Sequence, residues 1–439
     1  MRENNFTLYC DRIIVICLSL LIFCLPFAKA GVETFTWLAI FLWLLKRVLG
    51  YRTGSFWNFL PESELNRTLG VFIVINAVSV ILSINFGLSL RAFCGKELKF
   101  LAIYFIMIEV INSKKRLKNI LIMIIASASL IITDAMVQYF TGVDFLKGYE
   151  WSRLTASFST ANGFAAWLVL IILLFLGLIG VGKSIMRKIK GLVAILIMLL
   201  CTCLLMTYAR GAWIGFVIGI LFMVYYVIRG FSSKNKILFL SIGTCLLIVF
   251  LFLPQVAKNQ IKAIGRISFK SEEMIKERLK STVKLNEGSI IIRRYLWKEA
   301  LTVIEDYPLF GCGLNTYSTL MRNYKISDIS GYYAHNSYLQ MAAETGILGL
   351  TAFLWLLFRF FRMGILYFDN KKNYLVLGLL SGILAFLVHA FFDTHLYSLQ
   401  LVVLFWFMMG LTVAAIKIDR GEGKITAETV SSSRCLSTA

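Results

Sequence analysis

Long apolar runs separated by short polar connections make up most of the chain. Most of these runs have roughly the 20 residues that an α-helix needs to cross a lipid bilayer. Lipid offers the backbone no hydrogen-bond partner, so we expect the runs to form helices, which satisfy their own backbone groups. We predict twelve membrane spans, at 13–28, from about 34, and at 69–86, 92–111, 119–140, 162–182, 190–208, 211–229, 236–254, 337–361, 374–392 and 398–417.

One long polar segment, residues 255–335, separates the ninth span from the tenth. Within it, residues 257–284 alternate apolar with charged side chains and predict an amphipathic helix on the lipid headgroup surface. A second helix is predicted to begin at residues 293–294 and to end before Pro308, with an apolar stripe that faces the spans. That stripe consists of Trp297, Ala300, Leu301 and Ile304.

Lys and Arg are far more numerous in the connections on the N-terminal side of the membrane than in those on the other side. Cationic connections stay in the cytoplasm, so both termini are expected inside and the long polar loop outside. The fourth span begins irregularly, with Lys96, Glu97 and Lys99, which we expect to reach the interface or to line a cavity.

The tail after the last span is short, polar and rich in Ser and Thr, so we expect it to be disordered. The chain thus divides into spans one to nine (1–254), an external loop (255–335), spans ten to twelve (336–417) and a cytoplasmic tail (418–439).

Composition agrees with an all-α polytopic membrane protein. The hydrophobic fraction is 59% and the mean hydropathy +0.77, whereas soluble domains are about 45–50% apolar. The net charge of +21 lies in loops that face anionic lipid headgroups, and no cationic patch is free of a flanking span, so nucleic-acid binding is not indicated. The nine cysteines contain no CxxC pair and no Cys/His ligand spacing, which argues against a disulfide framework or a metal site.

Arg210 is the first candidate for chemistry, because it lies between two apolar runs in a connection of almost no length. An arginine at the centre of a span costs about 2.5–3.5 kcal/mol on insertion scales. Arg210 is expected near the outer end, where the cost is smaller but water is scarce. Its guanidinium has the geometry of a phosphate clamp, and the alternative is an arginine that extends to the interface. Arg293 and Arg294 of the loop helix are a second pair, of which one is expected to point into the cavity beneath.

His335 stands directly before the tenth span, followed by Asn336 and Ser337, which are favourable helix N-cap residues. A histidine near a helix N-terminus has its neutral form favoured, which suits a general base. The alternative is a histidine that only satisfies its hydrogen bonds at the interface. The functional interpretation is favoured because His335 shares the predicted outer layer with Arg210 and the loop arginines.

Further polar residues are predicted on the same face. Asn162 is expected to cap the sixth span, while Asp393 is expected to orient His335 or a sugar hydroxyl, or to serve as a cap. Arg153 and His395 belong to the same layer, and Asp134 is a buried acid within the fifth span. No HExxH, GxSxG or Walker pattern is present. Arginines with one histidine suit a reaction in which cations hold an anionic leaving group while a base deprotonates a hydroxyl.

These residues resemble the O-antigen ligase family, in the superfamily that also holds O-antigen polymerases and bacterial protein O-oligosaccharyltransferases. The resemblance covers nearly the whole chain in the number of spans and the place of the loop. The matching stretches are Tyr208–Trp213, Arg293–Trp297, Pro308–Gly313, and His335–Gln340 with Glu344–Gly349; Arg153–Asn162 and His389–Asp393 match more loosely.

The resemblance implies a GT-C-like, metal-independent glycosyltransferase of the bacterial inner membrane, without a cofactor and with its active site on the periplasmic face. The donor would be a glycan on undecaprenyl pyrophosphate, and the expected reaction is O-antigen ligation to the lipid A core. Polymerisation of glycan and protein O-glycosylation remain alternatives. A transporter of an anionic lipid-linked glycan is a different class, but it predicts charges deep in many spans, whereas most charges here lie at span ends.

The resemblance also assigns roles to residues. Arg210 and Arg293 match the positions that would bind the pyrophosphate, with Arg294 as the alternative to Arg293, and His335 would activate the acceptor hydroxyl. The residues expected to support them are Arg153, Asn162, Asn336 and Asp393.

Overall fold

The computed structural model describes residues 5–50, 60–148, 153–180, 190–229, 291–321 and 333–436, and within these ranges it is helical and contains no β-strand. The first half comprises α1 (Asn5–Cys24), α2 (Lys29–Gly50), α3 (Asn66–Ile81), α4 (Phe86–Ala92), a π-helical turn (Phe93–Glu97), α5 (Leu98–Val110), α6 (Lys114–Thr141), α7 (Ala161–Gly180), α8 (Lys190–Met206) and α9 (Arg210–Ile228). A helix over 291–306 follows, then α12 (Tyr317–Leu320), α13 (Ser337–Lys371), α14 (Tyr374–His389), a 3₁₀ turn (His395–Tyr397) and α15 (Leu399–Leu436).

The predicted apolar runs coincide with these helices wherever the structure describes them. Six of the described helices, namely α1, α6, α7, α9, α13 and α15, are long and apolar enough to cross a membrane, and α3, α8 and α14 are shorter apolar helices. The predicted ninth span at 236–254 and the predicted amphipathic helix at 257–284 lie outside the described residues. The chain is thus a helical membrane protein, and the total of twelve spans stays a prediction.

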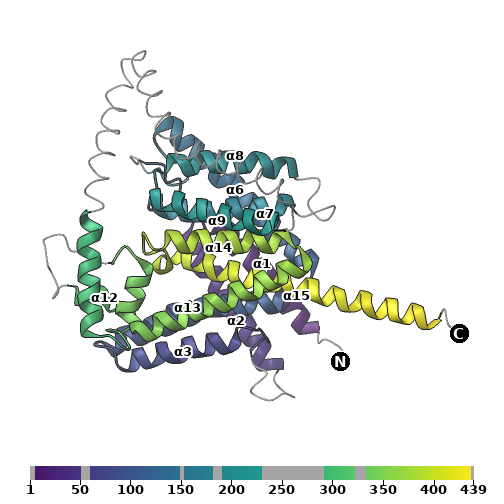
Figure 1. Ribbon diagram of the computed structural model, residues 1–439, viewed down its shortest axis with the longest axis horizontal. Coiled ribbons are helices and arrows are strands. Elements are labelled where there is room, and N and C mark those ends of the chain that lie inside the picture. The colour runs from purple at the N-terminus through teal and green to yellow at the C-terminus, as the bar shows by residue number, and fades with distance from the viewer. Residues whose placement is uncertain are drawn as a thin grey trace, which may run out of the picture.

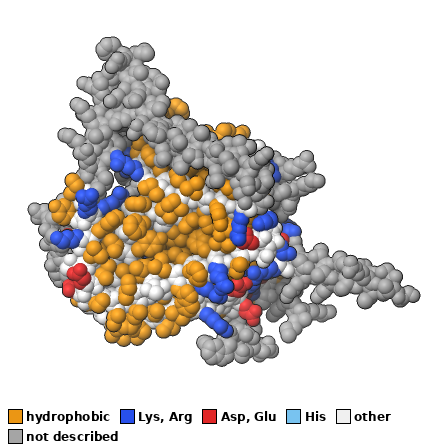
Figure 2. Space-filling view, viewed as in Figure 1, with side chains coloured by type: hydrophobic (Ala, Val, Ile, Leu, Met, Phe, Trp, Pro, Cys, Tyr) orange, Lys and Arg blue, Asp and Glu red, His pale blue; other side chains and the backbone are white. Residues whose placement is uncertain are grey.

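The long helices run across the molecule between two ends (Figure 1). Figure 2 shows hydrophobic side chains covering the middle of the visible face, while Lys and Arg gather towards both ends. Large apolar side chains such as Phe41, Val74 and Phe358 are more than half exposed. Such a belt would be unfavourable in water, and it is what a bilayer would cover.

Glycines bring α14 into backbone contact with α7 and α9. A Cβ added at Gly177 of α7 would lie 2.8 Å from the Cα of Gly378 in α14. On the other side, a Cβ at Gly215 of α9 would lie 2.4 Å from the carbonyl oxygen of Ala385. Small residues allow this close approach, which favours helix association in lipid. The contact fixes the ends of α7, α9 and α14 relative to one another.

A break in α13 anchors the segment that follows the loop helix. Gly346 has φ 72° and ψ 179°, a conformation open almost only to glycine. The break frees backbone groups of α13 for the turn 308–313. Cys312 N–H donates to the carbonyl of Ala343 (2.9 Å), and Gly313 N–H donates to that of Glu344 (2.9 Å). The turn is thereby attached to the spanning helix.

The helix over 291–306 buries or partly buries Trp297, Ala300 and Ile304 of the predicted stripe, but not Leu301. Leu301 is 49% exposed, whereas Leu296 and Val303 are buried together with Ala300. The sequence did not decide which face is buried, because two neighbouring faces of this helix both carry apolar residues. The predicted end before Pro308 is confirmed.

The expectation of disorder after residue 417 is wrong for the described part of the tail. Helix α15 continues to Leu436 without interruption. Extending an existing helix avoids the cost of nucleation, so a polar sequence can remain helical where composition alone predicts disorder.

Gly346→Ala should lower the folding stability by at least about 2 kcal/mol, because the backbone here excludes a side chain. An added Cβ would lie 2.0 Å from the carbonyl oxygen of Leu309. The matched control is Gly70→Ala in α3, where no atom lies within 4 Å of an added Cβ. Melting temperatures of the purified variants measure the difference. Equal melting of Gly346→Ala and the parent protein would contradict the break.

Candidate functional site

Three helix N-termini and one helix C-terminus meet at one end of the molecule. Helix α14 ends at His389, and the turn that follows it contains Asp393. Asn162 in the first turn of α7 and His335 before α13 both bond to Asp393. Arg210 begins α9, and the next residue, Gly211, lies against Phe392, since a Cβ there would be 2.8 Å from the Cβ of Phe392. Helix N-termini carry partial positive charge, so this end favours an anion.

His335 and Asp393 form the central pair of this end. The Nδ1 atom of His335 lies 2.9 Å from Oδ1 of Asp393. The other carboxylate oxygen of Asp393 accepts a hydrogen bond from the Nδ2 of Asn162 (2.7 Å). With Nδ1 donating to the carboxylate, the Nε2 of a neutral His335 is an acceptor. The imidazole is 45% exposed and the Asp393 side chain 15%, so the histidine can be reached while its partner is shielded.

The carboxyl group of Asp393 is ionised at neutral pH. Burial alone would raise its pKa, but the hydrogen bond from His335, attraction to His395 and His335 once these are protonated in acid, and the bond from Asn162 together hold the pKa well below its usual range. A buried carboxylate with these partners orients the imidazole and stabilises the imidazolium that forms when a proton is taken up.

The local backbone holds His335 in place. Its φ is 49°, in the left-handed region that few residues other than glycine occupy. Directly after it, Asn336 caps α13 by accepting from the N–H groups of Tyr338 (2.9 Å) and Leu339 (3.1 Å), as predicted. The hydroxyl of Ser337 donates to the carbonyl of Asp393 (2.9 Å). These contacts fix both partners of the pair at the same junction.

Arg153 and Arg210 contribute positive charge to this end. Arg153 is anchored, because its Nε and Nη2 atoms donate to the carbonyl of Thr207 at 2.8 and 2.6 Å. Its pKa is lowered by burial and then by Arg293 and Arg210, whereas Asp393 opposes the shift. Arg293 and Arg210 therefore both lie within electrostatic reach of Arg153. Arg210 itself is exposed at the start of α9.

The two loop arginines differ in their surroundings. Arg293 is half-buried and its charge acts on Arg153 and His395, whereas Arg294 is exposed. One turn further along the same helix, the Trp297 ring packs edge-on against Phe391 with centroids 5.6 Å apart. Arg293 is therefore the loop arginine whose charge reaches Arg153 and His395, while Arg294 is exposed.

One predicted role needs correction, and Asp134, predicted only as a buried acid, gains a role. Asn162 does not cap α7; the hydroxyl of Thr160 accepts from Gly163 N–H (3.0 Å) instead, which leaves the Asn162 amide to Asp393. Asp134 supports structure rather than chemistry. It accepts from the hydroxyl of Ser157 (2.6 Å) and from the N–H of Phe145 (3.0 Å) and so ties down the chain between α6 and α7.

The sequence analysis missed a pair of buried histidines beside Asp393. The rings of His389 and His395 lie 4.2 Å apart. Burial lowers the pKa of His395 to about 4, and Arg293 adds to this shift while Asp393 opposes it. His395 is therefore neutral at pH 7 and adds no charge next to the arginines. Among the residues that the structure describes, no group of three or more His, Cys, Asp or Glu side chains could hold a metal ion.

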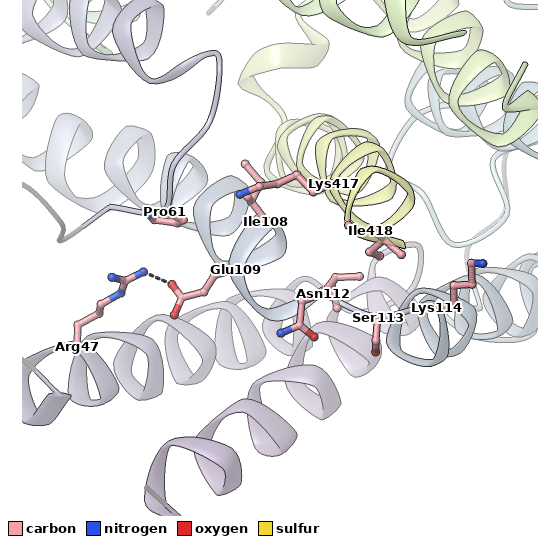
Figure 3. A pocket seen from close by; sticks show the side chains of 11 residues that line it. Arg47, Pro61, Ile108, Glu109, Asn112, Ser113, Lys114, Lys417 and Ile418 are labelled. Carbon is pink, nitrogen blue, oxygen red and sulfur yellow. Dashed lines mark hydrogen bonds and ion pairs between the residues drawn. The ribbon is translucent and has the colours of Figure 1, made fainter. Parts of the chain in front are cut away.

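A cavity of about 620 Å³ lies at the opposite end of the molecule (Figure 3). Figure 3 shows Arg47 paired with Glu109 on one side of it, and Lys114 and Lys417 on the others. Lys46 also bonds to Glu109 (2.9 Å). None of the predicted site residues lines this cavity, so it is not part of the candidate site.

The family model described as O-Antigen ligase matches residues 193–354. That range includes Arg210, Arg293 and His335. Over this range the chain is similar to the O-antigen ligase family, which confirms the resemblance drawn from the sequence. No curated protein matches the chain.

Acid should destabilise the folded chain through His395. Its pKa of about 4 in the folded protein lies below the value of about 6.5 for an unperturbed histidine. Between these values the unfolded chain binds more protons, so stability is full above about pH 6.5 and falls as the pH drops towards 4. Asp393 titrates only below this window. The melting temperature of His395→Asn should therefore fall less between about pH 7 and pH 5 than that of the parent protein. An equal fall would refute the assignment of the acid sensitivity to His395.

Proposed function

We propose that the chain transfers a glycan from undecaprenyl pyrophosphate to an acceptor hydroxyl, with the lipid A core as the acceptor of the ligation reaction. The observation that supports this most is the accessible His335, paired with a buried carboxylate and lying beside three arginines at one end of a membrane-spanning bundle. A base and a cluster of cations are what a hydroxyl attack on a pyrophosphate-activated sugar requires.

In the proposed reaction, the oxygen of the acceptor hydroxyl attacks the anomeric carbon of the donor sugar. At the same time the Nε2 of His335 takes the proton of that hydroxyl. The bond between that carbon and the pyrophosphate oxygen breaks, and the pyrophosphate leaves with the electron pair. Asp393 stabilises the imidazolium that forms. The proton on His335 is then passed to the leaving pyrophosphate or to water, which restores the base.

The arginines are assigned to the pyrophosphate. Arg210 and Arg293 are the residues whose guanidinium groups would contact its oxygens, because bidentate pairs with phosphate are strong and directional. Arg153 is held by the Thr207 carbonyl and serves to place positive charge behind them. The N-termini of α7, α9 and α13 add to the same potential. Because these groups already supply positive charge, we propose that the reaction needs no metal ion.

The location of the site fits a lipid-linked donor. A prenyl chain stays in the bilayer, so its pyrophosphate lies at the interface, where the ends of α7, α9 and α13 are found. From the distribution of Lys and Arg, we assign this end to the periplasmic side of the bacterial inner membrane and both termini to the cytoplasm. Ligation, polymerisation and protein glycosylation share this chemistry and differ in the acceptor. Assays with lipid A core, glycan and protein acceptors distinguish them.

His335→Ala should lower the rate of glycan transfer by about 10²–10⁴-fold, a typical contribution of acid–base catalysis, while donor binding through the arginines is retained. His335→Gln keeps a hydrogen bond to Asp393 but cannot take the proton, so it should fail as well. The measurement is transfer from purified lipid-linked donor to acceptor, with donor binding followed separately. Near-normal transfer by both variants would remove His335 from the chemistry. Loss of donor binding in both would make it a binding residue.

A further inference from the structure

A second cavity, distinct from the arginine cluster, lies between α3, α13, α15 and the π-helical turn. It has a volume of about 260 Å³ and is partly open. Aromatic side chains form its apolar part: Phe353 lies between Phe72 (centroids 5.9 Å apart) and Phe405 (6.1 Å), and Trp406 lines the same wall. Such a wall accommodates an acyl chain rather than a sugar.

The polar part of this cavity contains two buried oxygen atoms without a partner. Asn76 is 1% exposed, and its amide nitrogen donates to one carboxylate oxygen of Glu97. The remaining oxygens, Oδ1 of Asn76 and Oε2 of Glu97, have no hydrogen-bond donor among the described residues. Buried acceptors of this kind require a donor, and both of these residues line the cavity. A ligand with N–H or O–H groups would supply it.

The charges around the cavity favour a cationic donor. Lys99 is engaged by both carboxylate oxygens of Glu33 at 2.8 Å, and the Lys96 ammonium donates to the amide oxygen of Asn315 (2.8 Å). For Glu97 no ion pair occurs within the part of the chain that the structure describes. A primary ammonium offers three N–H donors, enough for both Oε2 of Glu97 and Oδ1 of Asn76, and its charge would favour the carboxylate form of Glu97, which burial disfavours.

Lys96 indicates that the ligand also carries an anionic group. Its side chain is exposed at the cavity, and with one of its three N–H groups on Asn315 the others remain to bind an anion. Lys96 and Glu97 are neighbours in the π-helical turn. The ligand would therefore carry an anionic group next to a cationic one. π-Helical turns within α-helices frequently occur at functional sites.

We propose that this cavity binds a membrane phospholipid with a phosphoethanolamine head group. The primary ammonium contacts Glu97 and Asn76, the phosphate contacts Lys96, and the start of an acyl chain lies against Phe72, Phe353 and Phe405. A choline head group has the same charge but no N–H to donate. A glycerol head group has no cation for Glu97. The cavity therefore discriminates among lipids by the head-group nitrogen.

Binding at this cavity would support the segments that carry the catalytic groups. Tyr333, two residues before His335, lines it, and so does Glu344, which accepts from the backbone N–H of Asn315 (2.9 Å). A bound lipid thus holds the turn after Gly313 and the approach to His335 against the spanning helices. This role goes beyond glycan transfer and requires none of the donor chemistry.

The test compares lysophosphatidylethanolamine with lysophosphatidylcholine of the same acyl chain, which differ only in the methyl groups on nitrogen. Each is titrated into the purified full-length protein, and the rise in melting temperature is followed together with lipid adducts in native mass spectrometry. The ethanolamine lipid should act at about tenfold lower concentration, because a charged hydrogen bond to a buried carboxylate is lost with choline. Equal concentrations for the two lipids would overturn the proposal.

Three variants complete the test. Glu97→Gln removes the charge and can satisfy Asn76 itself, so the preference for ethanolamine should fall to about threefold or less. Lys96→Gln, on an exposed side chain, should weaken both lipids alike and keep the preference, which makes the proposal testable even if a buried variant folds poorly. Glu64→Gln, an exposed acid paired with Arg420, is the control and should bind as the parent does. A preference that survives Glu97→Gln, or is lost in Glu64→Gln, would contradict the assigned site.

Discussion

Backbone contact between α14 and its neighbours α7 and α9 sets the position of every group at the candidate site. The contact depends on glycine, because a Cβ at Gly177, Gly215 or Gly378 would lie within 3 Å of backbone atoms of the facing helix. With the three helices locked side by side, the N-termini of α7 and α9 arrive beside the turn that ends α14. Asp393 in that turn then meets Asn162 from one helix, and Arg210 comes from the other.

The electrostatics of the site follow from this arrangement. Burial lowers the pKa of Arg153, and repulsion from Arg293 and Arg210 adds to this shift. The ionised Asp393 offsets part of this repulsion, and the buried His395 stays neutral and adds none. A pyrophosphate would relieve the remaining repulsion, so the site favours an anion. The partial exposure of His335 leaves its outer nitrogen open to an acceptor hydroxyl.

Much of this could be predicted from the sequence. The apolar runs predicted helices that the structure contains, and the N-cap before the tenth span was readable from Asn336 and Ser337. The pairing of Asp393 with His335 was one of several open alternatives, because residues far apart in the chain can be placed on one face but not in contact by pattern alone. To choose Arg293 over Arg294, one must know how the helix over 291–306 is rotated about its axis, and the sequence does not give this. Leu301 was assigned to the buried face of that helix for the same reason, and it is exposed. The glycines at 211, 215 and 219, spaced for close helix packing, were a signal that was present and not used.

The most direct test of the central claim uses the neighbouring arginines of the loop helix. Arg293→Ala and Arg294→Ala remove the same side chain from adjacent positions, one half-buried with its charge acting on Arg153 and His395, and one exposed. Transfer of glycan from purified lipid-linked donor is measured for both at matched protein levels. Arg293→Ala should lose at least about 100-fold in transfer, since it removes a charge contact to the leaving group, and Arg294→Ala should stay within a few-fold of the parent. Equal activity of the two variants, or a greater loss in Arg294→Ala, would contradict the account.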